Sequence, residues 1–186
     1  LPILCYPVSS MGSHVSVVPN HQLNRKTPLH TRANVAYFGT FGYELDLNKL
    51  SYEEISEVKQ QIAFMKEYRE LIQFGTFYRL KSPFEGNETA WMTVSEDKKT
   101  ALVFWYRERN VVNADFTRVR LQGLDPDFIY RNEYNGTENY GDELMNLGLL
   151  TTDCTAGEPT SEDAPCTDYE SRIYVLTTVA RIPSPL

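Results

Sequence analysis

Three pairs of acidic residues stand close enough in this sequence to act as a catalytic pair of carboxyl groups. They are Glu85 with Glu88, Asp125 with Asp127, and Asp142 with Glu143. Two carboxyl groups can serve as general acid and general base when their surroundings separate the two pKa values. Each pair, however, stands beside a Gly or Pro that marks a turn or a strand entry, where Asp and Glu are common for structural reasons. We therefore interpret all three pairs as structural.

The histidines and cysteines form no recognisable ligand set. His14, His21 and His30 are irregularly spaced, and the cysteines at positions 5, 154 and 166 match no zinc pattern. We expect no metal and no other cofactor. Because an odd number of cysteines gives no complete disulfide framework, we expect a reducing compartment and a cytoplasmic location.

The composition is typical of a packed globular protein. Of 186 residues, 41% are hydrophobic and 12% aromatic, which argues against disorder. The net charge is −7 and there is no basic run, so a nucleic acid would be repelled. The sequence has no apolar run near the roughly 20 residues that a membrane-spanning helix needs, so we expect no membrane partner.

The first 50 residues predict short strands around one short helix. Residues 4–8 and 14–18 have the apolar character of short buried strands or of βα-loop segments, and residues 37–47 predict a strand with an aromatic stripe. A helix is expected up to Ala36, with Thr27 as N-cap and Pro28 at the first helical position.

The clearest element is a long helix from Ser51 to Phe74. Ser51 and Glu54 form the pattern of a capping box, and Gly75 is a stop signal. Apolar residues recur every three or four positions and predict one buried stripe, which comprises Ile55, Val58, Ile62, Met65, Tyr68 and Ile72.

After Gly75 the apolar period changes from 3.6 to about 2, which indicates strands. The expected strands are residues 76–80, 89–95, 101–107, 116–121, 128–132, 144–149 and 171–179. Several short strands separated by turn signals favour an antiparallel β-sandwich. We therefore predict an α+β protein with a boundary near Gly75, which gives domains of residues 1–75 and 76–186.

Six separate segments, in a fixed order, carry a resemblance to a known family. They are YPVSSMGSHVS (Tyr6–Ser16), PNHQ (Pro19–Gln22), Thr27–Leu47, Arg69–Met92, LQGLDPDFIY (Leu121–Tyr130) and YGDELMNLGL (Tyr140–Leu149). These segments resemble the C-terminal part of bacterial alpha-galactosidases of glycoside hydrolase family 36. The likeness runs from about Cys5 to Leu150 and returns at Ser171–Leu176.

The resemblance implies the tail of a (β/α)8 barrel in residues 1–75, followed by an antiparallel β-sandwich. It also implies retaining hydrolysis of terminal α-galactosides of the melibiose and raffinose type, with neither metal nor cofactor. The family's nucleophile, an Asp in a Lys-Trp-Asp type motif, and its acid/base Asp after a Cys- and Gly-rich turn have no counterpart in this sequence. We therefore assign no catalytic residue, and we expect the catalytic carboxylates upstream of Leu1 and the chain to be inactive alone.

One segment is a candidate for contact with the sugar. In a barrel of this kind the active site lies at the carboxyl ends of the strands. Met11, Gly12, Ser13 and His14 would lie in the loop after the seventh strand, where they could line the rim of a galactose pocket or support it from behind. The alternative is that these residues only fix the loop.

Other functions remain open at this point. The chain could be a non-catalytic carbohydrate-binding module or a structural β-sandwich that supports a homo-oligomer. Two barrel strands and an amphipathic helix before the sandwich favour the galactosidase or the structural alternative over an independent binding module. Exposed edges of an incomplete barrel also predict self-association.

Overall fold

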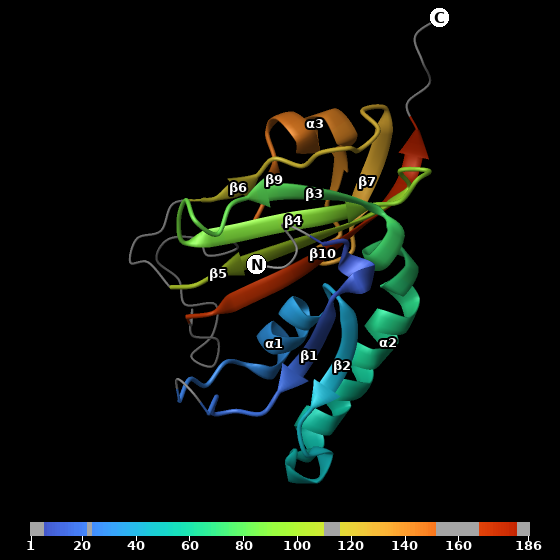
Figure 1. The fold of residues 1–186 in the computed structure, drawn as a ribbon. Helices are drawn as coiled ribbons and strands as arrows, with labels where there is room; N and C mark the ends of the chain where they lie inside the picture. The colour runs from blue at the N-terminus through green and yellow to red at the C-terminus, as the bar shows by residue number, and fades with distance from the viewer. Residues whose placement is uncertain (1–5, 22–23, 110–115, 152–167, 182–186) are drawn as a thin grey trace, which may run out of the picture. The chain divides into compact units, whose positions relative to one another are not determined.

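The computed structural model describes residues 6–21, 24–109, 116–151 and 168–181. The chain divides into two compact units, Leu1–Gly75 and Thr76–Leu186, which we call the N-terminal and C-terminal units (Figure 1). The three cysteines lie outside the described residues. No helix in the described part of the chain is both long and apolar enough to cross a membrane.

The N-terminal unit is built on two parallel strands joined by a helix. Strand β1 (Gly12–Ser16) is followed by α1 (Leu29–Ala36) and then by β2 (Thr40–Glu44), which pairs with β1 in parallel. The two strands lie side by side in Figure 1. A parallel pair needs a crossover connection, and α1 with its flanking loops supplies it.

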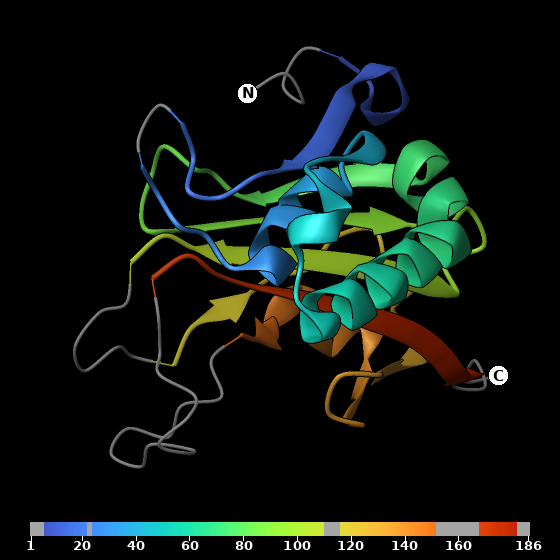
Figure 2. The same cartoon turned by 90° about the horizontal axis from the view of Figure 1, so that it is seen from below.

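Three further helical elements complete this unit. They are the 3-10 turns η2 (Val8–Ser10) and η3 (Leu47–Lys49) and the long helix α2 (Tyr52–Phe74). Figure 2 shows α2 and the shorter α1 from below. The two helices contact each other, and α1 also contacts both strands.

Local chemistry explains where these elements begin, and it corrects two expectations. The described part of residues 4–8 contains no strand, because the carbonyl group of Pro7 accepts hydrogen bonds from the amide and hydroxyl groups of Ser10 and starts η2. The N-cap of α1 is Pro28 rather than Thr27. The carbonyl group of Thr27 instead accepts a hydrogen bond from Arg32 Nε, at 3.1 Å.

The capping box of α2 is confirmed. The amide of Glu54 donates to Ser51 Oγ at 3.2 Å, and the amide of Ser51 donates to Glu54 Oε2 at 2.8 Å. Gly75 caps the other end with an extended backbone (φ −65°, ψ 164°), because the chain continues directly into a strand at Thr76.

The predicted buried stripe of α2 is wrong at two positions. Val58, Met65 and Ile72 are buried, but Ile55 and Ile62 are 37% and 36% exposed. The buried face is rotated toward Gln61, which is only 6% exposed. A pattern of apolar residues could not show this, because the residue at the centre of the buried face is polar.

The C-terminal unit contains a six-stranded antiparallel sheet in the order β3-β4-β5-β10-β7-β8. Its strands are β3 (Thr76–Lys81), β4 (Glu88–Val94), β5 (Thr100–Arg107), β7 (Phe128–Asn132), β8 (Glu138–Tyr140) and β10 (Glu170–Arg181). The long strand β10 brings the end of the chain between β5 and β7. Sequence reasoning missed only β8 among these strands.

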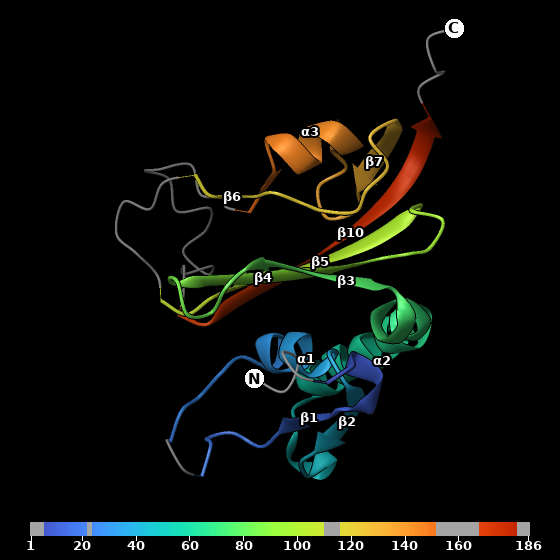
Figure 3. The same cartoon turned by 45° about the horizontal axis from the view of Figure 1, so that its top comes forward.

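A second layer covers one face of this sheet (Figure 3). It consists of helix α3 (Gly141–Asn146) and a ribbon of β6 (Arg118–Val119) with β9 (Leu149–Leu150). Apolar residues from both layers form one core, with Trp105, Tyr130 and Tyr174 as its largest buried side chains.

The strand expected at residues 144–149 is wrong in its first half, because Leu144–Asn146 belong to α3 and only Leu149 lies in a strand, β9. A Cβ atom on Gly141 would lie 2.0 Å from the carbonyl oxygen of Asp125, so only glycine allows α3 to start this close to a neighbouring segment. Asp142 and Glu143 occupy the first turn, where negative charge stabilises a helix. Six residues are too few for the apolar pattern to distinguish a helix from a strand.

A row of alternating charges lies at one end of the sheet. Glu88 and Glu170 are the cross-strand neighbours of Arg107. Arg107 forms an ion pair with Glu170, which also binds Arg172 at 2.7 Å, while Glu88 binds Lys81. The Arg107 side chain is only 7% exposed, so its charge depends on Glu170 for compensation.

Replacing Glu170 with Ala should therefore lower the free energy of unfolding by about 3 kcal/mol, because it leaves Arg107 buried without its partner. The matched control is Glu138→Ala, which breaks the Arg131–Glu138 pair, whose side chains are 49% and 44% exposed. Loss of that exposed pair should lower the free energy of unfolding by less than about 1 kcal/mol. Urea denaturation of both variants measures the difference, and equal losses would contradict this role of Glu170.

Candidate functional site

The two faces of the β1–β2 pair differ in character. Side chains alternate between the faces of a strand, so the register places Ser13, Val15, Phe41 and Tyr43 on one face. This face meets the helices: Val15 is fully buried, and the Tyr43 hydroxyl bonds to Gln61 of α2. The other face, which we call the open face, carries small or polar residues that are exposed or half-buried. They are Gly12, His14, Ser16, Thr40, Gly42 and Glu44.

A contact between a histidine and a carboxylate crosses the open face. His14 Nε2 lies 2.5 Å from Glu44 Oε2, and the two side chains are 53% and 72% exposed. In the strand register His14 stands opposite Gly42, two residues before Glu44. Since Gly42 has no side chain, nothing on β2 separates the imidazole from the carboxylate on this diagonal.

Arg32 of α1 fixes the carboxyl end of β1. Its Nη1 atom donates to the carbonyl oxygen of Ser16 at 2.5 Å. Burial lowers the pKa of Arg32, while the negative charges of Glu54 and Glu57 oppose that shift. The guanidinium therefore ties the end of the strand that carries His14 to the helix behind it.

The amino end of β1 is held by β2. The amide and hydroxyl groups of Thr40 both donate to the carbonyl oxygen of Met11, at 2.7 and 3.2 Å. Gly39 has φ 153°, and a Cβ atom there would lie 2.6 Å from the Met11 carbonyl oxygen and 2.8 Å from Ser13 Cβ. A glycine is thus required where the two strands approach.

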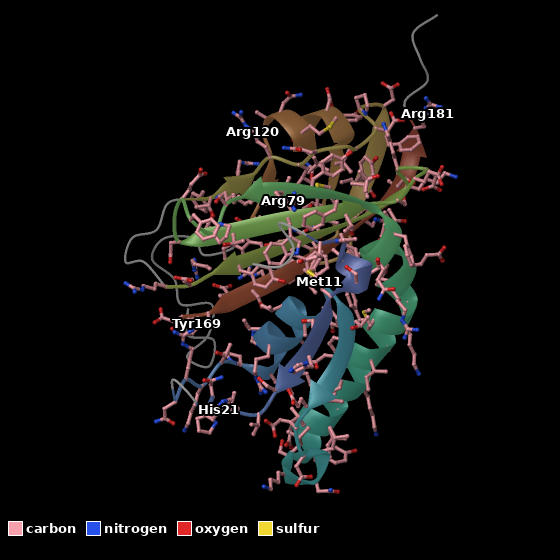
Figure 4. All side chains as sticks on the ribbon, viewed as in Figure 1. Met11, His21, Arg79, Arg120, Tyr169 and Arg181 are labelled. Atoms are coloured by element: carbon pink, nitrogen blue, oxygen red, sulfur yellow. The ribbon has the colours of Figure 1, made fainter. Side chains whose placement is uncertain are left out.

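These positions correct the expected location of the sugar-contacting segment. Met11 immediately precedes β1, and Gly12, Ser13 and His14 lie within it, so none of them is in a loop after the strand. Figure 4 labels Met11 at the amino end of β1 and His21 in the segment that follows the carboxyl end of β1. Of the four residues, His14 has the side chain that reaches toward the carboxyl end of the strand pair, where it meets Glu44.

Behind the strands, Gln61 organises a buried polar cluster. Its Oε1 accepts from the Tyr43 hydroxyl at 2.7 Å, its Nε2 donates to Glu57 Oε1 at 2.7 Å, and its carbonyl oxygen accepts from the Tyr37 hydroxyl at 3.3 Å. Burial, and secondarily the Glu57 charge, raises the pKa of Tyr43 to about 12. Burial also raises the pKa of Tyr37, with smaller contributions from Tyr43 and Glu57.

An open groove runs along the outer edge of β2, the edge that does not face β1. Its volume is about 460 Å³. Residues 40–43 of β2 form one wall, and Ile62, Met65, Lys66, Arg69 and Gln73 of α2 form the other. The exposed Ile62 therefore lines this groove, beside both apolar and charged side chains.

Comparison with known proteins assigns both units to one family. The model described as Melibiase matches residues 2–75, and the model described as Glycosyl hydrolase family 36 C-terminal domain matches residues 88–176. The chain belongs to glycoside hydrolase family 36.

Members of family 36 are similar to this chain in sequence and in structure. Alpha-galactosidase AgaA of Geobacillus stearothermophilus is 54% identical over 146 residues, which make up 78% of this chain and 20% of AgaA. The bifunctional alpha-galactosidase/sucrose kinase AgaSK of Mediterraneibacter gnavus is 47% identical over 144 residues, 77% of this chain and 15% of AgaSK.

A solved structure of an AgaA variant in complex with raffinose superimposes with a TM-score of 0.85 at 46% identity, over 95% of this chain and 23% of that one. The alpha-galactosidase from Lactobacillus brevis superimposes with a TM-score of 0.85 at 42% identity, over 97% of this chain and 24% of that one. The chain thus spans about a fifth of the length of the curated relatives it matches.

The three acidic pairs have structural partners in this family 36 chain. Asp125 Oδ1 accepts from the Asp127 amide at 3.0 Å, and Asp142 Oδ1 accepts from the Glu143 amide at 2.7 Å. Glu88 binds Lys81 and the Thr117 hydroxyl. No group of three or more metal-ligating side chains occurs in the part of the chain that the structure describes.

Sequence reasoning missed Glu44, Arg32 and Gln61. Glu44 is one acidic residue among many, and only the parallel register reveals that it meets His14. Arg32 and Gln61 act across 16 and 18 residues of chain, on Ser16 and Tyr43 respectively. The pattern PLHTR, which places a lone Arg on the first turn of a short helix, is the only local signal for Arg32.

The raised pKa of Tyr43 predicts how stability changes at alkaline pH. The folded state keeps the phenol proton to about pH 12, whereas the unfolded chain releases it near pH 10. Stability from this group is therefore complete below about pH 10 and is lost as the pH rises toward 12. Tyr43→Phe should show a shallower alkaline loss of unfolding free energy than the unsubstituted chain. Urea titrations at pH 9–12 measure it, and identical slopes would contradict the buried position of this phenol.

Proposed function

We propose that the whole protein is a retaining alpha-galactosidase that removes terminal α-galactosyl residues from melibiose- and raffinose-type oligosaccharides. In this proposal the N-terminal unit is the last part of the (β/α)8 catalytic barrel, and the C-terminal unit is the antiparallel β-sandwich that follows it. The observation that carries the proposal is the contrast between the two faces of the β1–β2 pair.

Parallel strands are normally covered on both faces. Among the residues that the structure describes, helices cover only the face with Val15 and Tyr43, and the open face bears small and polar residues. This is the arrangement of a barrel wall, with helices outside and functional groups inside. A βαβ unit that ends in a long amphipathic helix supplies two such wall segments.

The groove beside β2 supports the same proposal. The outer edge of β2 needs a strand partner, and the exposed Ile62 needs apolar cover. A neighbouring strand placed there would satisfy the backbone of β2 and cover Ile62 of α2.

The chemistry of the reaction defines what this chain contributes. Retaining hydrolysis needs a nucleophilic carboxylate and an acid/base carboxyl group about 5–5.5 Å apart. The three acidic pairs found in the sequence are engaged in turns, a helix start and an ion pair. The contribution of this chain is therefore the wall of the pocket, and the two reacting carboxyl groups come from elsewhere in the barrel.

The substrate class rests on the relatives. AgaA variants have been solved in complex with raffinose and with stachyose. We extend this class of α-galactoside to the whole protein, together with the cytoplasm as its compartment. The unpaired edge of β2 also supports self-association of the chain when it is isolated.

A hybrid enzyme tests the proposal. The matched 146-residue segment of AgaA is replaced by the corresponding residues of this chain. We expect hydrolysis of p-nitrophenyl α-galactoside within about tenfold of AgaA, since a misplaced barrel wall would cost on the order of a hundredfold. The isolated chain should show no turnover above a buffer blank, because the nucleophile and the acid/base are absent.

Substitutions at two glycines provide a test and its matched control. Gly39→Ala should abolish activity in the hybrid, because its Cβ atom overlaps the Met11 carbonyl group, whereas Gly86→Ala meets nothing within 4 Å. A hybrid that folds with a cooperative thermal transition and yet lacks activity would contradict the proposed function. Turnover by the isolated chain that depends on one of its own carboxylates would also contradict it.

A further inference from the structure

We propose that Glu44 is a substrate-binding residue of the galactoside pocket, that it accepts a hydrogen bond from a sugar hydroxyl group, and that His14 is the residue that positions it. This inference rests on the proposed function and adds to it a residue pair that the sequence did not reveal.

The position of Glu44 is the first argument. Glu44 is the last residue of β2, on the open face. The arrowheads of β1 and β2 in Figure 1 point the same way and mark the ends where Ser16 and Glu44 lie. In barrel enzymes the substrate binds at the carboxyl ends of the strands.

The chemistry of the pair is the second argument. His14 Nε2 contacts the Oε2 atom of Glu44. The other carboxylate oxygen, Oε1, has no hydrogen-bond partner among the described residues. A carboxylate oxygen with a fixed orientation is a strong acceptor for a hydroxyl donor. Because His14 holds the side chain in place, Glu44 loses less rotamer entropy when it binds a ligand.

The surroundings of the pair leave room for a ligand. The other residues of the open face are Gly12, Ser16, Thr40 and Gly42, and none of them has a large side chain. On the opposite face, by contrast, Gln61, Tyr43 and Glu57 bond to one another within the packing against α2. That face is filled by packing within the chain, while the residues that β1 and β2 contribute to the open face leave space beside the carboxylate.

Stability alone does not explain the pair. In this chain the His14 and Glu44 side chains are 53% and 72% exposed, and a contact exposed to that degree contributes little to the folding of the chain. Arg32, Thr40 and Gly39 already fix both ends of β1 without it. The pair is therefore free to serve binding, and its loss should leave the fold intact.

The active hybrid carries the test, with p-nitrophenyl α-galactoside as substrate and free galactose as inhibitor. Glu44→Gln should raise KM and the galactose inhibition constant by about tenfold and lower kcat by less than about threefold, as expected for lost ground-state binding. His14→Gln should raise KM by about threefold. The double variant should resemble Glu44→Gln alone, because the two residues act as a unit.

Controls separate binding from folding. Glu70→Gln, an exposed carboxylate on α2, should leave KM within about twofold, and all variants should keep their melting temperature within a few degrees. Glu44→Asp, which keeps the charge, should recover part of the affinity.

The outcomes are distinguishable. Unchanged KM and galactose inhibition in Glu44→Gln would overturn the role of Glu44 and leave the proposed function standing. Independent, multiplicative effects of His14→Gln and Glu44→Gln would overturn the positioning role of His14. A folded but inactive hybrid with both residues intact would overturn the proposed function and this inference with it.

Discussion

The parallel pairing of β1 and β2 is the constraint on which the N-terminal unit depends. The register from Gly12–Thr40 to Ser16–Glu44 decides which side chains meet the helices and which face outward. It also places His14 opposite Gly42, so that the His14 side chain reaches Glu44 two residues further along β2. A shift of one residue would exchange the two faces and put Val15 in the open. Gly39 and the two bonds from Thr40 to the Met11 carbonyl oxygen oppose that shift.

Charge serves different purposes in the two units. In the C-terminal unit Arg107 and Glu170 are mostly buried cross-strand neighbours, so each requires the other for stability. In the N-terminal unit the His14 and Glu44 side chains are exposed in this chain, and their contact adds little to its folding. The same kind of contact therefore matters for folding where water is excluded and adds little to folding where water has access.

Local signals in the sequence predicted local structure well. The Ser51–Glu54 capping box and strand β7 were found because a few neighbouring residues determine them. The buried face of α2 was misjudged, because Gln61 is buried through partners on β2 and in the segment after α1. Helix α3 was mistaken for a strand, since its start depends on the approach of Gly141 to Asp125. The His14–Glu44 pair could not be predicted, because it exists only in the folded register.

The account depends most on β2 being an inner strand of a larger barrel. The Thr40 amide bonds to Met11, so the alternating amides of Phe41 and Tyr43 point to the open edge. Residue-resolved amide hydrogen exchange should show Phe41 and Tyr43 exchanging rapidly in the monomeric chain and at least about a hundredfold more slowly in the AgaA hybrid. Equal protection of these two amides in the chain alone would contradict the account and indicate that the N-terminal unit is already complete.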